Sequence, residues 1–478
     1  MKSAELLGLS ATELSRLIHA RKVAPSEVMA AWLERVASVN GAVNAIVSLR
    51  DPDDLMAEAR ALDDVAPVGW LHGIPLAIKD LLATKGLRTT YGSPLYADFL
   101  PEADDLVVAR IRTSGAVIAG KTNTPEWGQG SHSFNPVHGV TRNPYDLARS
   151  AGGSSGGAAA ALASGMAWVA DGSDMMGSLR NPAGFCNVYG LRPTWGLVPG
   201  DAGGETHLAT LATEGPMART VEDLARFLGV MAGENRETPF PRALPDLLSG
   251  LEAGVKGKKI GWLGDWGGAY PMEPGILAAC EAGLRVLEDL GAEVETLPPP
   301  FPAQELWQAW IALRAMLNAG GKSDLARDPA KRALTKAETI WEIERGAGLT
   351  AAEVYAASEI RSRWYRDAAR MFDRFDAVVL PSAQVWPFPA EWRWPEEIAG
   401  VRMDTYHRWM EVVVPASLIG LPALSVPLGF GPQGLPSGMQ IIGRSGDDAG
   451  VLAIGQAYHR ATLWPQRQPA LAAGAVSR

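Results

Sequence analysis

Apolar residues recur at helical spacing near the start of the chain. Ser10 and Glu13 are spaced as a capping box, the arrangement in which a hydroxyl and a carboxylate satisfy the first N–H groups of a helix. The apolar positions that follow at helical spacing are Leu14, Leu17 and Ile18, and then Val28, Trp32, Val36 and Val39. The pattern predicts amphipathic surface helices in this region and disfavours a signal peptide.

Short apolar runs along the rest of the chain predict strands. They span residues 76–78, 116–119, 258–263, 292–297, 376–380, 423–428 and 439–442. A helical pattern over 276–290 lies between two of these runs and completes a strand, helix, strand unit. Because the runs lack alternation, we expect an α/β fold with a sheet buried on both faces by helices. The segment 465–478 is rich in Pro, Ala and Gln, and we expect it to fray.

Two uncharged stretches are long enough to suggest membrane spans, but neither fits one. Residues 150–170 are mostly Gly, Ala and Ser, which are too weakly apolar to insert. Residues 412–443 are interrupted by Pro415, Pro422, Pro427, Pro432 and Pro436. We therefore expect no membrane partner.

Composition narrows the class of protein. No linker, repeat or low-complexity tract divides the 478 residues, so we interpret residues 1–478 as one domain. A net charge of −9 and the lack of a basic run disfavour nucleic acid and favour a small, neutral substrate. Cys186 and Cys280 lie in apolar contexts, which is typical of reduced core thiols in a cytoplasmic protein.

Three residues form a candidate catalytic constellation. Ser154 lies in a run of glycines from 152 to 157, and Ser178 directly follows Gly177. Glycine lets hydroxyls and backbone N–H groups be approached closely. Lys79 ends a short apolar run, where burial would lower its pKa toward that of a usable base.

With these motifs the chain resembles the amidase signature family of serine hydrolases. The resemblance implies Lys79 as the base, Ser154 as a bridging serine on a cis peptide, and Ser178 as the nucleophile. It also implies a large mixed β-sheet sandwiched between layers of α-helices, and it places Asp174 and Arg180 in supporting positions.

The resemblance extends well beyond the triad. Segments similar to family signatures are Gly120–Glu126, Arg180–Ala183, Gly190–Thr194, Gly215–Thr220 and Gly420–Gly443. We therefore divide the domain into a core signature at about 65–225, a variable segment at about 298–410 and a C-terminal family segment at about 411–465.

Each candidate residue also has a structural interpretation. A serine among glycines is usually part of a loop or a helix cap, and a lysine at a strand end is usually solvated. The joint spacing of Lys79, Ser154 and Ser178 favours the catalytic interpretation. Asp80 would raise the pKa of Lys79 if it lay close, so the hypothesis requires its side chain to point elsewhere.

Two other motif matches are rejected. Residues 115–122 fit the phosphate-loop expression, but their interior is an apolar strand that no helix follows. Gly152, Ser154 and Gly156 fit the nucleophile elbow of α/β-hydrolases, which requires a preceding strand, and residues 146–151 do not read as one. The seven histidines show no metal-ligand spacing, so we expect no metal and no cofactor.

The chemistry needs a proton relay and an oxyanion hole. A neutral Lys79 can accept the proton of Ser178 through the hydroxyl of Ser154. The expected oxyanion donors are the backbone N–H groups of Met175, Met176, Gly177 and Ser178.

Substrate identity is the least determined part of the sequence. The family usually has glycine where this chain has Met176, which either adopts a strained left-handed backbone or lines the pocket with its thioether. Met176 and Trp127 are the pocket candidates. Eight tryptophans lie in the variable segment and form either an aromatic substrate wall or core: Trp307, Trp310, Trp341, Trp364, Trp386, Trp392, Trp394 and Trp409.

The function expected is hydrolysis of the C–N bond of a small, apolar or aryl amide or carbamate. The alternatives are a carbamate-specific urethanase, the amidase subunit of a glutamine-dependent tRNA amidotransferase, and a non-catalytic binding relative. An intact triad argues against the last, and the tryptophan-rich segment argues mildly against the amidotransferase. We expect a small-molecule substrate and, as protein assembly, either a monomer or a homodimer.

Overall fold

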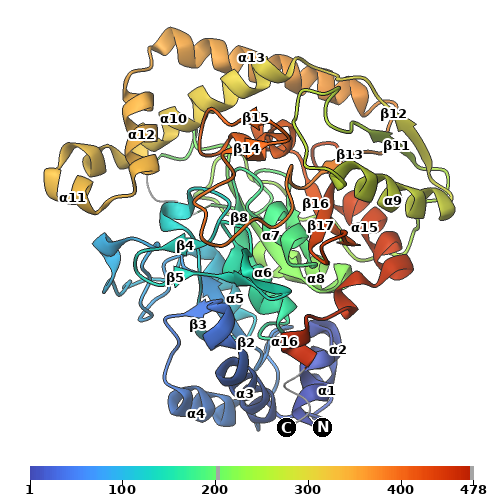
Figure 1. Ribbon diagram of the computed structural model, residues 1–478. Coiled ribbons are helices and arrows are strands. Elements are labelled where there is room, and N and C mark those ends of the chain that lie inside the picture. Colours follow the sequence, from blue (N-terminus) through green and yellow to red (C-terminus); the bar gives the residue numbers. More distant parts are fainter. Residues whose placement is uncertain (201–204, 474–478) are drawn as a thin grey trace.

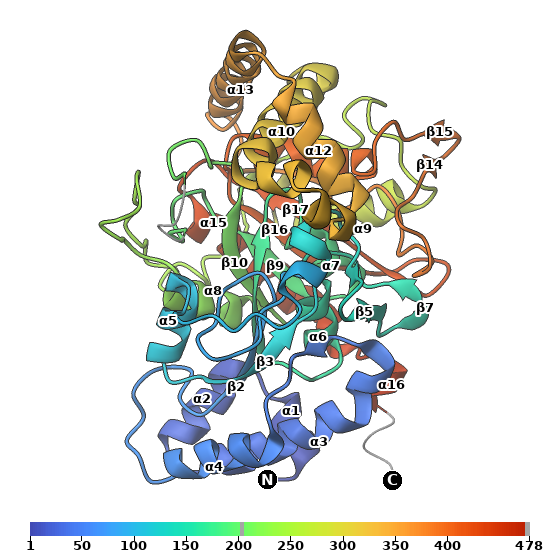
Figure 2. The ribbon, with the colours of Figure 1, turned by 90° about the vertical axis from the view of Figure 1, so that its left-hand side faces the viewer.

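The computed structural model describes residues 1–200 and 205–473. Its chain begins with four helices, α1 (Ser3–Gly8), α2 (Ala11–His19), α3 (Pro25–Val43) and α4 (Pro52–Leu62). Ser10 accepts the N–H of Glu13 and Glu13 accepts the N–H of Ser10, which confirms the predicted capping box at the start of α2. These helices lie together at the end of the molecule that carries the N-terminus (Figures 1 and 2).

The central feature is an eight-stranded mixed sheet with the strand order β12-β11-β13-β17-β16-β9-β10-β8. Its strands are β8 (Val169–Asp174), β9 (Tyr189–Arg192), β10 (Thr213–Ala218), β11 (Lys259–Trp262), β12 (Glu293–Thr296), β13 (Ala377–Pro381), β16 (Ala423–Phe430) and β17 (Pro436–Ile442). β11 pairs in parallel with β12 and β13, and the other pairs are antiparallel. The predicted strands from residue 258 onward are thereby confirmed.

A small second sheet carries the lysine. β2 (Pro75–Lys79) is parallel to β3 (Val117–Thr122), which pairs on its other side with β1 (Ile46–Val47). The backbone N–H of Lys79 donates to the carboxylate of Asp171 on β8 at 3.1 Å. The small sheet therefore places Lys79 beside the edge strand of the large one.

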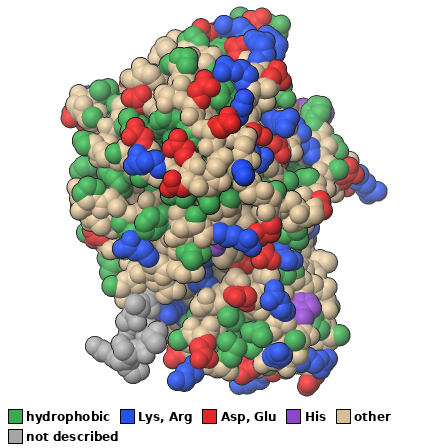
Figure 3. Space-filling view, turned by 90° about the vertical axis from the view of Figure 1, so that its right-hand side faces the viewer, with side chains coloured by type: hydrophobic (Ala, Val, Ile, Leu, Met, Phe, Trp, Pro, Cys, Tyr) green, Lys and Arg blue, Asp and Glu red, His purple; other side chains and the backbone are tan. Residues whose placement is uncertain are grey.

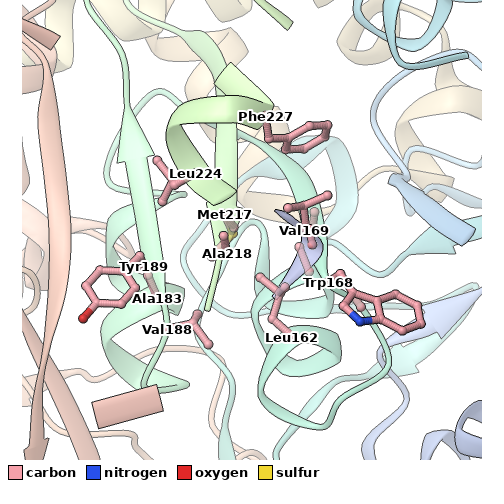
Figure 4. Packing of buried hydrophobic residues seen from close by; sticks show 14 of the residues in the cluster. Leu162, Trp168, Val169, Ala183, Val188, Tyr189, Met217, Ala218, Leu224 and Phe227 are labelled. Carbon is pink, nitrogen blue, oxygen red and sulfur yellow. The ribbon is translucent and has the colours of Figure 1, made fainter. Parts of the chain in front are cut away.

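Helices cover the large sheet in two layers. The helices outside the N-terminal group and the variable segment are α5 (Leu106–Thr113), α6 (Gly156–Ala163), α7 (Arg180–Phe185), α8 (Val221–Met231), α9 (Ile276–Asp289), α14 (Val414–Leu418), α15 (Asp448–Thr462) and α16 (Ala470–Ala473). α8, α9 and α15 form one packed group on the sheet, while α6 and α7 form another. Figure 4 shows how Leu162, Val169, Ala183, Met217 and Phe227 meet between these elements.

The variable segment is mainly helical. It contains α10 (Ala303–Arg327), α11 (Pro329–Leu334), α12 (Ala337–Ala347) and α13 (Ala351–Met371), which cap the end of the molecule opposite the N-terminal helices (Figure 1). Trp307, Trp310, Trp364 and Trp409 are buried there in a second apolar cluster, so half of the eight tryptophans are core.

Short elements complete the described chain. The remaining strands are β4 (Phe134–Asn135), β5 (Gly139–Val140), β6 (Arg142–Asn143), β7 (Asp146–Ser150), β14 (Glu397–Ile398) and β15 (Val401–Arg402). The 3-10 helices are η1 (Pro94–Tyr96), η2 (Glu126–Gly128), η3 (Arg408–Val413) and η4 (Trp464–Gln466). Acidic and basic side chains are interspersed on the face drawn in Figure 3.

One expectation about the strands is wrong. Residues 146–151 were expected to form no strand, yet β7 pairs with β6 in a two-stranded hairpin. The polar sequence of β7 gives no apolar signal because its middle residues are exposed and it lies outside the large sheet. The phosphate-loop rejection is confirmed, since β3 occupies the interior of that match and no helix follows it directly.

Two further expectations concern the cysteines and the C-terminal segment. Cys186 and Cys280 are buried and unpaired, as predicted. Residues 470–473 form α16 rather than fraying, and residues 474–478 lie outside the described chain. None of the helices in the described chain is long and apolar enough to cross a membrane.

Candidate active site

Lys79 lies at the end of β2, completely buried among hydroxyl groups. Its Nζ donates to Ser154 Oγ at 2.8 Å, to Ser155 Oγ at 2.8 Å and to Ser173 Oγ at 2.9 Å. The structure thus brings the predicted base and bridging serine into direct contact. It also adds Ser155 and Ser173, which the sequence analysis did not single out.

The surroundings of Lys79 favour its neutral form. Burial lowers the pKa of Lys79, and the carboxylates of Glu214, Asp171 and Asp174 partly oppose this shift. Asp80 turns away, as required: its carboxylate accepts the backbone N–H of Thr90 at 2.9 Å. The lysine therefore sits in low-dielectric surroundings, with no carboxylate within 4.0 Å of Nζ among the described residues.

Ser154 follows a cis peptide bond between Gly153 and Ser154. This agrees with the expectation that the family resemblance gave. The glycine at 153 is needed for close packing, because a Cβ there would lie 2.9 Å from the backbone nitrogen of His132. Ser154 and Ser155 are buried between β7 and α6, with Ser154 facing the candidate pocket.

Ser178 lies in the loop between β8 and α7, and its side chain lines the same cavity as Ser154. It is 6% exposed, so a ligand in the cavity can reach it while bulk water is largely excluded. Its carbonyl oxygen accepts the N–H of Ser155 at 3.2 Å, which ties the loop of the nucleophile candidate to the glycine-rich run.

The expected oxyanion donors do not all remain available. The N–H of Gly177 donates to Asp174 Oδ1 at 2.9 Å, so this group is already engaged. The N–H groups of Met175, Met176 and Ser178 stay candidate donors of the oxyanion hole. The sequence does not show that the Gly177 N–H is engaged, because this depends on the orientation of the Asp174 carboxylate beneath the loop.

Two arginines hold Asp174 in place. Arg180 donates to both carboxylate oxygens, at 2.9 and 3.0 Å, and Arg192 lies 3.3 Å from Oδ1. Burial would raise the pKa of Asp174, but Arg180 and then Arg192 hold it well below its usual range. The bracing roles inferred for Asp174 and Arg180 fit this geometry. Arg192 is an additional brace that its signature segment could have suggested.

Met176 has an ordinary backbone conformation, whereas Gly177 does not. Gly177 has a φ of 78°, and a Cβ there would lie 2.9 Å from Val413 Cγ2. Met176 is not among the described non-glycine residues with positive φ. The loop therefore needs glycine at 177 only, and the strain interpretation of Met176 is excluded.

The site opens into a small cavity of about 180 Å³. Its apolar walls are Leu81, Trp127, Met175, Met176 and Met410, and its polar walls include Gln129, Glu214, Arg314, Asn318 and Lys322. Both pocket candidates from the sequence, Met176 and Trp127, line it. Trp127 stacks on Tyr91 with ring centroids 5.6 Å apart, which fixes one flat wall.

The tryptophans of the variable segment do not form the pocket wall. None of the eight contributes to the lining of this cavity, whereas Arg314, Asn318 and Lys322 on α10 do. Arg314 is anchored by Glu342 at 2.8 Å and by Tyr406 at 2.9 Å. The variable segment thus supplies polar groups to the site, a role that its aromatic composition did not suggest.

Glu214 is the functional-site residue that sequence reasoning missed most clearly. It lies on β10 directly opposite Ser173 of β8 and lines the cavity. Its Oε2 is buried without a hydrogen-bond partner. Burial raises the pKa of Glu214, and the nearby Lys79 opposes that shift. Its proximity to Ser173 depends on the antiparallel register, which the linear sequence does not show.

No group of three His, Cys, Asp or Glu side chains in residues 1–200 and 205–473 is arranged to hold a metal ion. The cations of the site are lysine and arginine, its one lining carboxyl group is Glu214, and its other polar side chains are serines and amides. This donor set is suited to acyl transfer.

Comparisons with known proteins agree with this geometry. The amidase family model matches residues 27–452. A glutamyl-tRNA(Gln) amidotransferase subunit from Moorella thermoacetica is 35% identical and aligns over 98% of this chain and 99% of its own. An acylamidase from Rhodococcus erythropolis is 33% identical, with coverage of 98% and 99%.

Solved structures give the same result. A bacterial aryl acylamidase of the amidase signature enzymes superposes with a TM-score of 0.89 at 30% identity, covering 98% of this chain and 99% of its own. A 6-aminohexanoate cyclic dimer hydrolase superposes with a TM-score of 0.86 at 25% identity, with the same coverage. Because the family model and these relatives span nearly the whole sequence, the chain belongs to the amidase signature family of hydrolases.

Proposed function

We propose that this enzyme hydrolyses the C–N bond of a small amide through an acyl-enzyme on Ser178. The observation that carries the proposal is the 2.8 Å contact between Lys79 Nζ and Ser154 Oγ, at the base of the cavity that Ser178 also lines. A buried lysine without an ion-pair partner, next to hydroxyls that lead to a pocket, is suited to proton transfer.

In the first step Ser178 Oγ attacks the carbonyl carbon of the amide. Its proton passes to Ser154 Oγ, while Ser154 gives its own proton to the lone pair of neutral Lys79. Neutral Lys79 has two N–H groups and one lone pair. It can therefore donate to the hydroxyls of Ser155 and Ser173, while its lone pair accepts the hydroxyl proton of Ser154. The N–H groups of Met175, Met176 and Ser178 are the candidate donors to the developing oxyanion.

In the second step the tetrahedral intermediate collapses. Protonated Lys79 returns a proton through Ser154 to the departing nitrogen, the C–N bond breaks, and an amine leaves. Water then attacks the ester carbon, its proton follows the same route to Lys79, and that proton returns to Ser178 as the acid is released. No step consumes a cofactor or a metal.

The pocket supports a small substrate with a flat or apolar acyl or aryl part. Its volume of about 180 Å³ lies below the usual range for drug-sized ligands, and Trp127, Met175 and Met176 form its apolar wall. The relatives that act on acylamides and aryl acylamides are consistent with this class. We include carbamates among the proposed substrates because their hydrolysis, like that of amides, begins with attack of the serine on the carbonyl carbon.

The test is a panel of anilides, primary amides and carbamates with the purified enzyme. We expect turnover of at least one small anilide or amide, and an intact-mass increase equal to the acyl group when the reaction is quenched early. Ser178→Ala should show neither. An acyl adduct that persists in Ser178→Ala would place the nucleophile elsewhere, and turnover of carbamates alone would assign the enzyme as a urethanase.

A second candidate is the amidase subunit of a glutamine-dependent amidotransferase. It is favoured by relatives of that name that are 34–35% identical over nearly the whole chain. This function predicts hydrolysis of glutamine to glutamate and a particle that gains activity with partner subunits. Anilide turnover by the isolated chain, without glutaminase activity, would assign the enzyme to the free amidases. Failure of all substrates with an intact fold would favour a non-catalytic relative.

We expect a small-molecule substrate, no nucleic acid or membrane partner, a cytoplasmic enzyme, and a monomer or homodimer. Size-exclusion chromatography with light scattering decides the oligomeric state.

A further inference from the structure

A second cavity, of about 490 Å³, lies between α13 and four loops of the chain. Its walls include Ser358, Arg361, Tyr365 and Arg366 of α13, together with Trp195 and Arg242 from loops. α13 runs along the top of the molecule in Figure 1. The lining of this cavity shares no residue with that of the catalytic cavity.

Three arginines line this cavity, and none of them has an ion-pair partner within 4.0 Å among the residues that the structure describes. Arg242 donates to the carbonyl of Trp195 at 2.9 Å and to Ser445 Oγ at 3.1 Å. Arg361 donates to Thr210 Oγ1 at 2.7 Å. Arg366 makes neither a hydrogen bond nor an ion pair with any residue that the structure describes. All acceptors are therefore neutral, although the chain as a whole carries nine more acidic than basic residues.

Three carboxylates that lie near these lining residues in sequence have other hydrogen-bond or ion-pair partners. Asp447 lies 3.7 Å from Arg444. Asp448 accepts the N–H of Thr194 at 2.8 Å, and the charge of Arg242 acts on it from a longer distance. Asp367 accepts from Arg370 on the same helix. Arg361 is partly buried and burial lowers its pKa, so its positive charge would be stabilised by an anion in the cavity.

Aromatic and apolar side chains also line the cavity. Trp195, Tyr365 and Ile419 line it together with the arginines. Guanidinium groups bind carboxylate and phosphate oxygens through parallel N–H donors, while aromatic rings accept a planar apolar body. The serine hydroxyl of Ser358 adds a neutral donor at the rim.

We propose that this cavity binds a small organic oxyanion, a carboxylate or phosphate attached to an aromatic body. A volume of about 490 Å³ fits a molecule of this class. This cavity is separate from the catalytic cavity, but one short segment links them. Arg361 donates to Thr210, and Ala212, two residues later, lines the catalytic cavity.

The test is isothermal titration calorimetry of the full-length enzyme with phenyl phosphate, benzoate and inorganic phosphate. We expect phenyl phosphate to bind more tightly than inorganic phosphate, because only the former uses the rings. Arg361→Gln and Arg366→Gln should each weaken phenyl phosphate binding at least tenfold, the usual effect of losing a charge-assisted hydrogen bond. Benzoate binding decides whether a carboxylate is accepted in place of phosphate.

Arg370→Gln is the matched control. It removes one positive charge from the same helix, but Arg370 pairs with Asp367 and does not line the cavity. Its affinity should stay within twofold of wild type. Arg366 is exposed, so Arg366→Gln keeps the test valid if Arg361→Gln lowers the melting temperature. No binding of phenyl phosphate by wild type, or equal affinities for all four proteins, would overturn the proposal.

Discussion

Met176 offers the sharpest test of how the pocket selects substrates. Its side chain is 2% exposed, lines the catalytic cavity and has an ordinary backbone conformation. Met176→Ala removes three heavy atoms without forcing a new backbone conformation. At about 0.8 kcal/mol for each buried methylene-sized group, the space released corresponds to about 2 kcal/mol of apolar contact.

A bulky substrate that fills this space should recover that energy, whereas a small one should not. We expect the ratio of kcat/KM for a bulky aryl amide over acetanilide to rise about 30-fold in Met176→Ala, which is the equivalent of about 2 kcal/mol. The assay is steady-state kinetics of wild type and variant on both substrates. Met176→Gly should change the ratio in the same direction.

The control is Met29→Ala, which truncates a fully buried methionine of α3 outside the cavity. Both variants should lose about 2 to 5 kcal/mol of stability in urea unfolding, but only Met176→Ala should change the substrate ratio. An equal change in kcat/KM for both substrates would refute the reasoning, because it would mean that Met176 acts on the oxyanion loop instead of on the pocket.

The remaining predictions concern the chemistry. Ser178→Ala should lose essentially all turnover with an unchanged circular dichroism spectrum, and hydrolysis within tenfold of wild type would remove Ser178 from its role. Ser154→Ala should be damaging but less complete, since a water can replace the relay. Because burial lowers the pKa of Lys79, activity should rise with pH through an apparent pKa well below the value of about 10.4 for free lysine. Lys79→Ala should have a much lower rate and should lose this rise of activity with pH. An unchanged pH profile in Lys79→Ala would assign the base elsewhere. EDTA should leave activity unchanged, and inhibition that added metal reverses would contradict the mechanism.

The sequence predicts most of the strands because apolar runs are a local signal, while the catalytic roles of Lys79, Ser154 and Ser178 stay a prediction. Apolar runs mark the buried strands, such as β13 and β17, and the glycine-rich motif marks Ser154. β7 was missed because a strand outside the main sheet needs no apolar pattern. The interpretation of 1–478 as one domain stays a prediction.

The site features that the sequence does not predict depend on contacts between residues far apart in the chain. Glu214 approaches Ser173 only through the register of β8 and β10, and Arg314 reaches the cavity only because α10 caps the sheet. The orientation of the Asp174 carboxylate, which removes the Gly177 N–H from the oxyanion donors, is set by two arginines from different elements. Contacts between such distant residues produce no periodic pattern in the sequence from which they could be predicted.

The cluster of Asp174, Arg180 and Arg192 has a consequence for the electric field at the reacting carbonyl. One carboxylate faces two guanidinium groups, all three fully buried, so a net positive charge remains beneath the loop that carries Ser178. At an effective dielectric constant of about 20, a unit charge contributes about 4 kcal/mol at 4 Å and half of that at 8 Å. Salt screens such buried charges poorly. The transition state should therefore be stabilised nearly equally in dilute and in concentrated salt.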